Sequence, residues 1–80
     1  MKSVHSDRYK ALLRALVAAR KAAKITQAEL AGFLGKPQSF VSKYESGERR
    51  LDVEEFLEVC ELVDADAIKM LQQLRPHQGR

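Results

Sequence analysis

The segment from Thr26 to Gly47 constrains the fold of this 80-residue chain more than any other part of its sequence. Thr26 and Glu29 have the spacing of a capping box, in which the hydroxyl and the carboxylate each accept a backbone N–H that the first helical turn leaves unpaired. A helix is therefore expected to begin at about Gln27. The same segment also contains glycine and proline, which commonly end one helix and begin the next.

Glycine and proline positions predict that another helix directly follows the one that begins at Gln27. Gly35 is expected to end the helix that begins at Gln27, because glycine adopts the left-handed conformation at little cost. Pro37 then suits the first position of the next helix, where a backbone N–H is not needed, and Gly47 is placed to end that helix. Two short helices joined by a tight corner have the geometry of a helix-turn-helix.

The residues on this frame resemble those of the phage-repressor and Cro-like (Xre-type) helix-turn-helix proteins. That family shows Thr-Gln-x-x-Leu-Ala in its second helix, a glycine in the corner, and a Ser-x-x-Ser-x-x-Glu-x-Gly pattern in its third. The matching residues are Thr26, Gln27, Leu30, Ala31, Gly35, Ser39, Ser42, Glu45 and Gly47. The resemblance runs from about Arg8 to Leu74. It implies an all-α fold, a compact five-helix bundle of the lambda-repressor-like DNA-binding type, with the helix-turn-helix formed by helices 2 and 3.

Length and composition predict one small globular domain over residues 1–80, with a core of about 6–74 and flexible tails at 1–5 and 75–80. Apolar residues make up 45% and charged residues 31% of the chain, and no apolar run is long enough to span a membrane. The N-terminus lacks the apolar region of a secretory signal, and the single cysteine, Cys60, has no partner for an internal disulfide. A cytoplasmic protein is expected.

An enzyme is not expected, nor are cofactors or a metal. His5 and His77 lie in the terminal segments, and Cys60 falls on a predicted buried stripe. The sequence contains no glycine-rich phosphate loop and no cluster with metal-ligand spacing.

The charge distribution predicts an oriented approach to a polyanion. Residues 1–50 contain eleven Lys/Arg and four Asp/Glu, a net +7, and residues 51–80 contain three and seven, a net −4, which together give the +3 of the whole chain. The basic half contains the predicted helix-turn-helix, so we expect it to face nucleic acid. Lys10, Arg14 and Lys21 share one face of the first helix, which is either a solvated surface or, as the resemblance implies, near a phosphate.

Helical periodicity predicts which residues are buried. The predicted inward residues are Tyr9, Leu12, Leu13, Leu16 and Val17 in the first helix, Ala28, Leu30, Ala31 and Leu34 in the second, and Val41, Tyr44 and Glu45 in the third. In the fourth they are Val53, Phe56, Leu57, Cys60 and Val63, and in the fifth Ile68, Leu71 and Leu74. The candidate caps of the other helices are Ser6 or Asp7 for the first, Asp52 with Glu55 as a second capping box for the fourth, and Asp66 for the fifth. Asp64 occupies a helix-ending position where relatives often carry glycine.

Arg20 is the exception in this pattern, because its position projects onto the apolar stripe of the first helix. A guanidinium there needs a partner. Glu45, inward-facing in the third helix, is the candidate, and the family pattern also pairs an arginine and a glutamate at the matching positions. We expect a largely buried structural ion pair.

The exposed face of the third helix is expected to read bases in the major groove of DNA. The candidate base-reading residues are Gln38, Ser39, Phe40, Ser42 and Lys43. Phe40 lies between two faces of the helix, and two interpretations stay open: packing beside Tyr44, or contact with a thymine methyl group. The candidate phosphate contacts are Gln27, Lys36, Ser46, Arg49 and Arg50, which would position the domain without reading sequence.

Together these observations predict a sequence-specific double-stranded DNA-binding transcriptional regulator, a repressor in the leading interpretation, which binds a two-fold related operator as a homodimer. The alternative is an interaction protein, such as an antitoxin that binds a toxin, or a helix-turn-helix domain used only for protein contacts. The fourth and fifth helices are expected to face away from DNA and to be free for dimer contacts.

Overall fold

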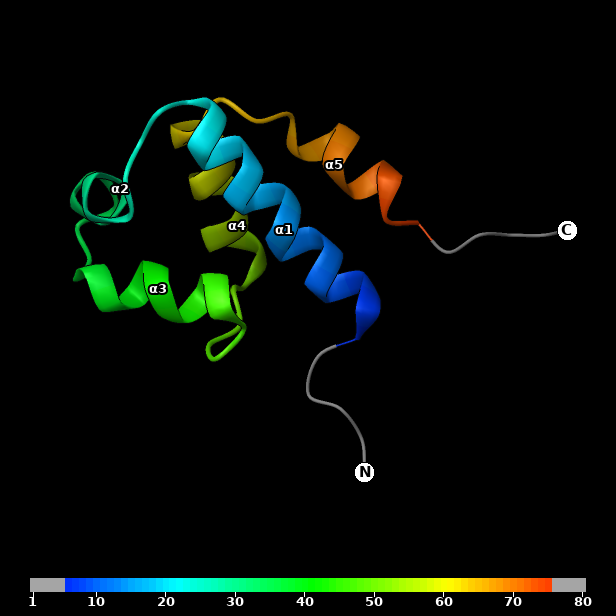
Figure 1. Cartoon of the computed structure of the whole chain (residues 1–80). Coiled ribbons are helices and arrows are strands. Elements are labelled where there is room, and N and C mark those ends of the chain that lie inside the picture. Colours follow the sequence, from blue (N-terminus) through cyan, green and yellow to red (C-terminus); the bar gives the residue numbers. More distant parts are fainter. Residues whose placement is uncertain (1–5, 76–80) are drawn as a thin grey trace, which may run out of the picture.

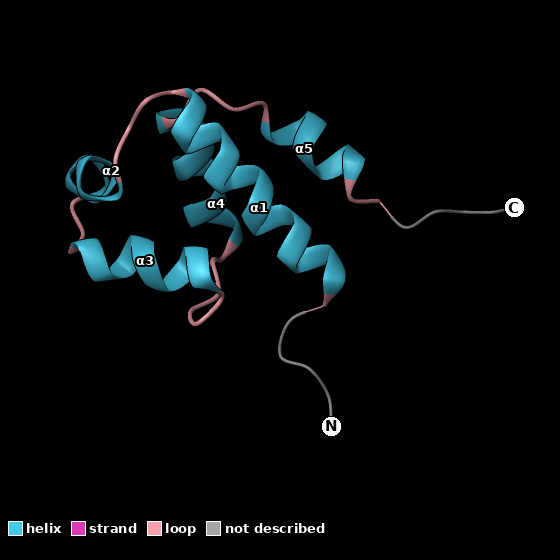
Figure 2. Ribbon diagram, in the orientation of Figure 1, coloured by secondary structure: helices cyan, strands magenta, loops and turns pink. Residues whose placement is uncertain are grey.

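The computed structural model describes residues 6–75, which form five α-helices and no strand (Figures 1 and 2). The helices are α1 (Asp7–Ala22), α2 (Gln27–Leu34), α3 (Gln38–Ser46), α4 (Val53–Leu62) and α5 (Ala67–Gln73). The predicted all-α, five-helix fold is therefore confirmed. Of the proposed tails at 1–5 and 75–80, residues 1–5 and 76–80, with His5 and His77, lie outside the described residues.

Helix α1 lies at the centre of the bundle and contacts both α3 and α5, while α2 packs against α3 and α4 (Figure 1). The two helices of the helix-turn-helix are thus each supported by another helix: α3 packs against α1, and α2 packs against α4. Tyr44, Leu16, Leu30, Val41 and Val59 are the largest fully buried side chains, and they come from four helices. The centre of the core therefore lies directly beneath α3.

Side-chain caps begin four of the helices, as the sequence patterns predict. Ser6 Oγ accepts the Tyr9 N–H at the start of α1, and Asp52 and Asp66 accept the N–H groups of Glu55 and Lys69 at α4 and α5. The Thr26 cap of α2 is described below. Each carboxylate or hydroxyl satisfies one of the N–H groups that a first turn leaves free. These caps define the helix starts through contacts within the first turn of each helix.

Two helices end on residues other than glycine in the left-handed conformation. Lys24 has φ 62° and Asp64 has φ 60°. The residue after each of them donates a backbone hydrogen bond to the last turn of the helix: the Ile25 N–H bonds the Arg20 carbonyl, and the Ala65 N–H bonds the Cys60 carbonyl. This is the Schellman arrangement, which usually uses glycine. Asp64 is therefore the residue at which the chain leaves α4.

Several predicted core positions are wrong. Ala28, Val53, Leu57, Ile68 and Leu71 are exposed, whereas Val59 and Met70, which the periodicity did not select, are buried. For the four residues of α4 and α5 the reason is that these helices lie at the edge of the bundle and are covered over a narrow arc only. Residues on the flank of each predicted stripe therefore reach solvent.

Cys60 is 2% exposed and sits in the core, as predicted. Burial, with a smaller effect of the Asp66 charge, raises the pKa of its thiol. Burial likewise raises the pKa of Tyr44, and its hydroxyl has no hydrogen-bond partner among the described residues. Both groups behave as parts of the apolar core.

Candidate nucleic-acid interface

The turn between α2 and α3 is built as the sequence suggests, with one difference. The Thr26 hydroxyl accepts the Glu29 N–H at 3.0 Å, and the Glu29 carboxylate accepts the Thr26 N–H at 2.9 Å, so the capping box is complete. Gly35 has φ 70°, and the Lys36 N–H bonds the Ala31 carbonyl at 2.9 Å.

Pro37 differs from its prediction, because it is the N-cap of α3 rather than the first helical residue. Its backbone is extended, and no side chain caps the helix. Gly47 ends α3 with φ 88°, as expected. The corner therefore holds α3 at a fixed angle to α2, with the N-terminal turn of α3 open to solvent.

Arg20 and Glu45 form the expected ion pair between α1 and α3. Arg20 Nε donates to Glu45 Oε2 at 2.7 Å and Nη2 donates to Oε1 at 3.2 Å, and the side chains are 9% and 7% exposed. Arg20 Nη1 donates to the Ile25 carbonyl at 2.8 Å. The hydrogen bond to Glu45 is the main cause that raises the pKa of Arg20. A charge-assisted, two-pronged pair of this kind fixes both side chains in orientation.

A hydrogen-bond chain links this pair to the surface of α3. Gln27 Nε2 donates to Glu45 Oε1 at 2.8 Å, and Gln38 Nε2 approaches Gln27 Oε1 at 3.4 Å. Gln38 is the first residue of α3 and is exposed. Two residues proposed to touch DNA are thus connected to a buried carboxylate. The sequence placed Gln27 and Gln38 near the interface but did not show that they contact each other.

The other predicted residues on α3 lie mostly on its outer face. Ser39, Lys43 and Ser46 are exposed, and Ser42 is half-buried. The Ser42 hydroxyl donates to the Ser39 carbonyl at 3.2 Å, and the Ser46 hydroxyl donates to the Lys43 carbonyl at 3.1 Å. Each hydroxyl oxygen keeps acceptor capacity, and a rotation of the side chain frees the donor.

Phe40 is buried, with 8% of its surface exposed. Its ring packs edge-on against Tyr44 at 5.9 Å between centroids. Lys36 Nζ lies 5.2 Å and Arg49 Cζ 4.6 Å from the centroid of the same ring. The packing interpretation therefore describes Phe40 in the free protein, and the thymine contact stays a prediction.

The basic residues after α3 are held by side chains outside the helix-turn-helix. Arg49 makes a two-pronged pair with Glu55, with both nitrogen–oxygen distances 3.0 Å. This pair is the main cause that lowers the pKa of Glu55, and the Asp52 backbone N–H adds to it. Arg50 stacks over the Tyr9 ring at 4.6 Å, and the Tyr9 hydroxyl accepts the Leu51 N–H at 3.1 Å.

Glu55 and Tyr9 were missed as site-positioning residues. The sequence assigned Glu55 to a capping box and Tyr9 to the buried stripe of α1, and both assignments hold in part: Glu55 Oε1 does accept the Asp52 N–H, and Tyr9 is half-buried. Their second contacts depend on how residues 47–52 fold back, for which no periodic pattern gives a signal.

Within residues 6–75 no helix is long and apolar enough to cross a membrane, and no three His, Cys, Asp or Glu side chains gather as metal ligands would. The polar and cationic side chains on and beside α3 are of the kinds that contact bases and phosphates in DNA complexes.

Comparisons with known proteins agree with this geometry. A family model described as helix-turn-helix matches residues 16–66. A solved structure, an XRE-family like protein from Pseudomonas syringae pv. tomato str. DC3000, is 57% identical, covers 84% of this chain and 82% of its own, and superposes with a TM-score of 0.80. The comparison with curated proteins gave no significant match. The chain belongs to the Xre-type helix-turn-helix family.

Proposed function

We propose that this chain is a sequence-specific double-stranded DNA-binding transcriptional regulator, and that α3 enters the major groove. The major groove is wide enough to admit one α-helix, and it presents a distinct pattern of donors and acceptors for each base pair. The exposed outer face of α3 carries serine and lysine side chains, with Gln38 at its leading end. In this arrangement α3 reads bases while α2 lies across the sugar–phosphate backbone.

The observation that carries the proposal is the orientation of Gln38 by Gln27. A glutamine amide can bond adenine through its N6 and N7 groups at once, but only in one orientation. Because Gln27 is itself held by Glu45, the Gln38 amide is restrained before DNA arrives. A restrained side chain loses less conformational freedom on binding. Gln38 is therefore proposed as the principal base-reading residue.

Phosphate contacts are proposed for a second set of groups around this centre. They are the Gln27, Ser46, Lys36, Arg49 and Arg50 side chains. Arg49 already pairs with Glu55, so a phosphate would have to share or replace that carboxylate. Lys36 and Arg50 are exposed cations in the basic half of the chain. Contacts of this kind set affinity and register rather than sequence preference.

A homodimer on a two-fold related operator is also proposed. Ile68 and Leu71 lie three residues apart on α5 and are both exposed, so they share one face of that helix. A symmetric contact through this face would bury them. The dimer would act on the chromosome in the cytoplasm, and occupation of an operator would repress transcription.

The proposal is tested by selecting bound sequences from a random duplex pool and titrating the selected duplex against a scrambled one at two salt concentrations. Gln38→Ala should relax the choice of base at one position per half-site. Lys36→Ala should weaken binding to both duplexes and lower the salt dependence by about one unit of slope. If the wild-type chain showed no preference among duplexes but bound a protein partner tightly, the interaction-module alternative, such as an antitoxin, would replace this function.

A further inference from the structure

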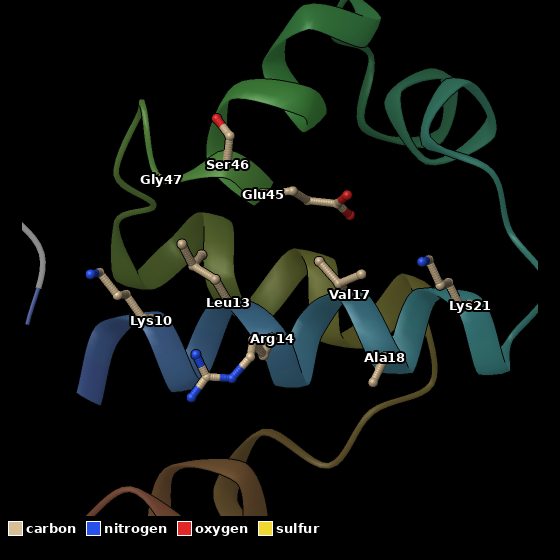
Figure 3. A pocket seen from close by; sticks show the side chains of 9 residues that line it. All are labelled: Lys10, Leu13, Arg14, Val17, Ala18, Lys21, Glu45, Ser46 and Gly47. Atoms are coloured by element: carbon tan, nitrogen blue, oxygen red, sulfur yellow. The ribbon is translucent and has the colours of Figure 1, made fainter. Parts of the chain in front are cut away.

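A groove of about 580 Å³ lies between α1 and the C-terminal end of α3 (Figure 3). Leu13 and Val17 point from α1 toward Glu45 on the opposite side, and Lys10 and Lys21 stand on either side of them (Figure 3). Ser46 completes the α3 wall. The groove therefore has an apolar floor and a cation at each end.

The charges of this groove are not neutralised within the described chain. Lys10, Arg14 and Lys21 are exposed, and none of them forms an ion pair with another residue of 6–75. The one carboxylate in the wall, Glu45, is already bonded to Arg20 and Gln27. The groove thus presents a net positive, partly apolar surface, for which an acidic amphipathic helix is the complementary shape and charge.

Such a helix exists in the same chain. On α4, Val53 is 75% and Leu57 is 47% exposed, and their spacing of four residues places them on one face. Glu54, Glu58 and Glu61 are exposed beside them. This set of five residues is called here the α4 stripe. Within the described residues Val53 is largely uncovered, and close to half of Leu57 is open to solvent.

We propose that the α1–α3 groove of one copy receives the α4 stripe of a second copy. The apolar residues of the stripe would cover Val17, which is half-buried beside the buried Leu13, and the carboxylates of the stripe would face the lysines. The dimensions are compatible: Lys10 to Lys21 spans about 16 Å of helix and Glu54 to Glu61 about 10 Å, at about 1.5 Å per residue. The stripe therefore fits between the two end cations.

The contact joins two different surfaces, because the groove residues come from α1 and α3 and the stripe from α4. A heterologous contact leaves one groove and one stripe free at the ends of each pair, so further copies can add. This inference goes beyond the proposed function and needs no DNA. On adjacent operators it would make occupation cooperative, because DNA raises the local concentration of copies. In solution the contact is weak and salt-sensitive, since it depends on exposed ion pairs.

The test uses two full-length variants that can form this contact in one direction only. The first has an intact groove and a disabled stripe, with the exposed substitutions Val53→Ser, Glu54→Gln and Glu58→Gln. The second has an intact stripe and a disabled groove, with Lys10→Gln and Lys21→Gln. The first is labelled with ¹⁵N and titrated with the unlabelled second at low salt, with circular dichroism as a check of folding.

Saturable amide shifts over residues 10–21 and at Ser46 of the labelled chain are expected, and they should vanish when the unlabelled chain carries both sets of substitutions. With the labels exchanged, the shifts should move to residues 53–61. Shifts confined to α5, or none up to millimolar concentration, would overturn the proposal. In contrast, failure of the DNA selection would leave these shifts in place, so the two proposals fail separately.

Charge reversal gives a second measurement. Lys10→Glu with Lys21→Glu should weaken self-association about tenfold at low salt, because two attractions become repulsions. Adding Glu54→Lys and Glu58→Lys to the same chain should restore it. The matched control is Lys24→Glu, compared with Lys21→Glu alone: both change the net charge equally, but Lys24 does not line the groove. Equal effects of the two single reversals would contradict a contact at the groove.

Discussion

Gln27 donates its side-chain amide to Glu45 at 2.8 Å, so a residue of the proposed DNA-binding surface is bonded directly to the buried ion pair. Glu45 therefore has two tasks. It neutralises Arg20 between α1 and α3, and it restrains the side chain that neighbours Gln38. Removal of Glu45 should affect both the stability of the domain and the orientation of its base-reading residue.

Glu45→Ala should lower the free energy of unfolding by roughly 3–5 kcal/mol, because it leaves the Arg20 guanidinium buried without its counter-charge. Urea denaturation followed by circular dichroism measures the change. Glu48→Ala is the matched control, since Glu48 is exposed three residues along the chain, and it should stay within about 0.5 kcal/mol of wild type. A loss below about 1 kcal/mol for Glu45→Ala would show that the pair is not a structural link.

Gln27→Ala should reduce discrimination at the same base pair as Gln38→Ala. The latter should cost roughly 1–3 kcal/mol per half-site at the preferred base, because one bidentate contact is lost. Once Gln27 is absent, the Gln38 amide is no longer restrained, so the two losses should not add. A double-mutant cycle on preferred and substituted duplexes measures the coupling, expected to be at least about 0.5 kcal/mol. Independent effects at different base pairs would contradict the orienting role of Gln27.

Glu55→Gln should make the stability of the domain less sensitive to acid. In the folded chain Arg49 and the Asp52 N–H hold the pKa of Glu55 below its usual value, which is about 4.3 in an unfolded chain. Between these two values the unfolded state binds more protons, so stability present above about pH 4.3 is lost as the pH falls through the folded-state pKa. Thermal melts of wild type and variant across this interval measure the difference.

Glu58→Gln, on the exposed side of the same helix, is the control for this pH profile. It should follow the wild type through the acid range, because no ion pair of Glu58 is found among residues 6–75. If Glu55→Gln and the wild type lost stability in parallel, the pair with Arg49 would contribute nothing to the fold.

Gly32→Ala and Gly35→Ala should have opposite effects on stability. A Cβ atom would meet nothing within 4 Å at either position, so packing does not separate them. Gly32 lies inside α2, where alanine is favoured over glycine by up to about 1 kcal/mol. Gly35 has φ 70°, which costs an alanine roughly 1 kcal/mol. Denaturation midpoints compare the two variants, and changes of the same sign would refute the assigned turn.

Helix starts could be predicted from the sequence because caps are local. Thr26 with Glu29, and Asp52 with Glu55, satisfy backbone groups of their own first turn, so their pattern does not depend on distant packing. The depth of burial could not be predicted in the same way. Periodicity shows that Val53 and Leu57 share a face, but only the neighbouring helices decide how far that face is covered.

The candidate site could be predicted in part for a similar reason. Arg20 stood out because a charge on an apolar stripe requires a partner, and the family pattern supplied Glu45. The pair of Arg49 with Glu55 and the contact of Gln38 with Gln27 depend on the angles at which a loop and two helices meet. Those angles cannot be predicted from the sequence pattern, so the residues could be identified from the sequence but their mutual contacts could not.

Because Cys60 is buried, the rate at which its thiol is labelled measures how often the structure around it opens. A thiol-specific alkylating reagent can reach the single thiol only when α4 separates from the core, so the labelling rate in native buffer equals the intrinsic thiol rate multiplied by the open fraction. The dependence of that rate on low denaturant concentration shows how much surface the opening exposes. A steep dependence would mean that α4 is released only with global unfolding. A flat one would mean that the C-terminal helices open by themselves while the helix-turn-helix stays folded.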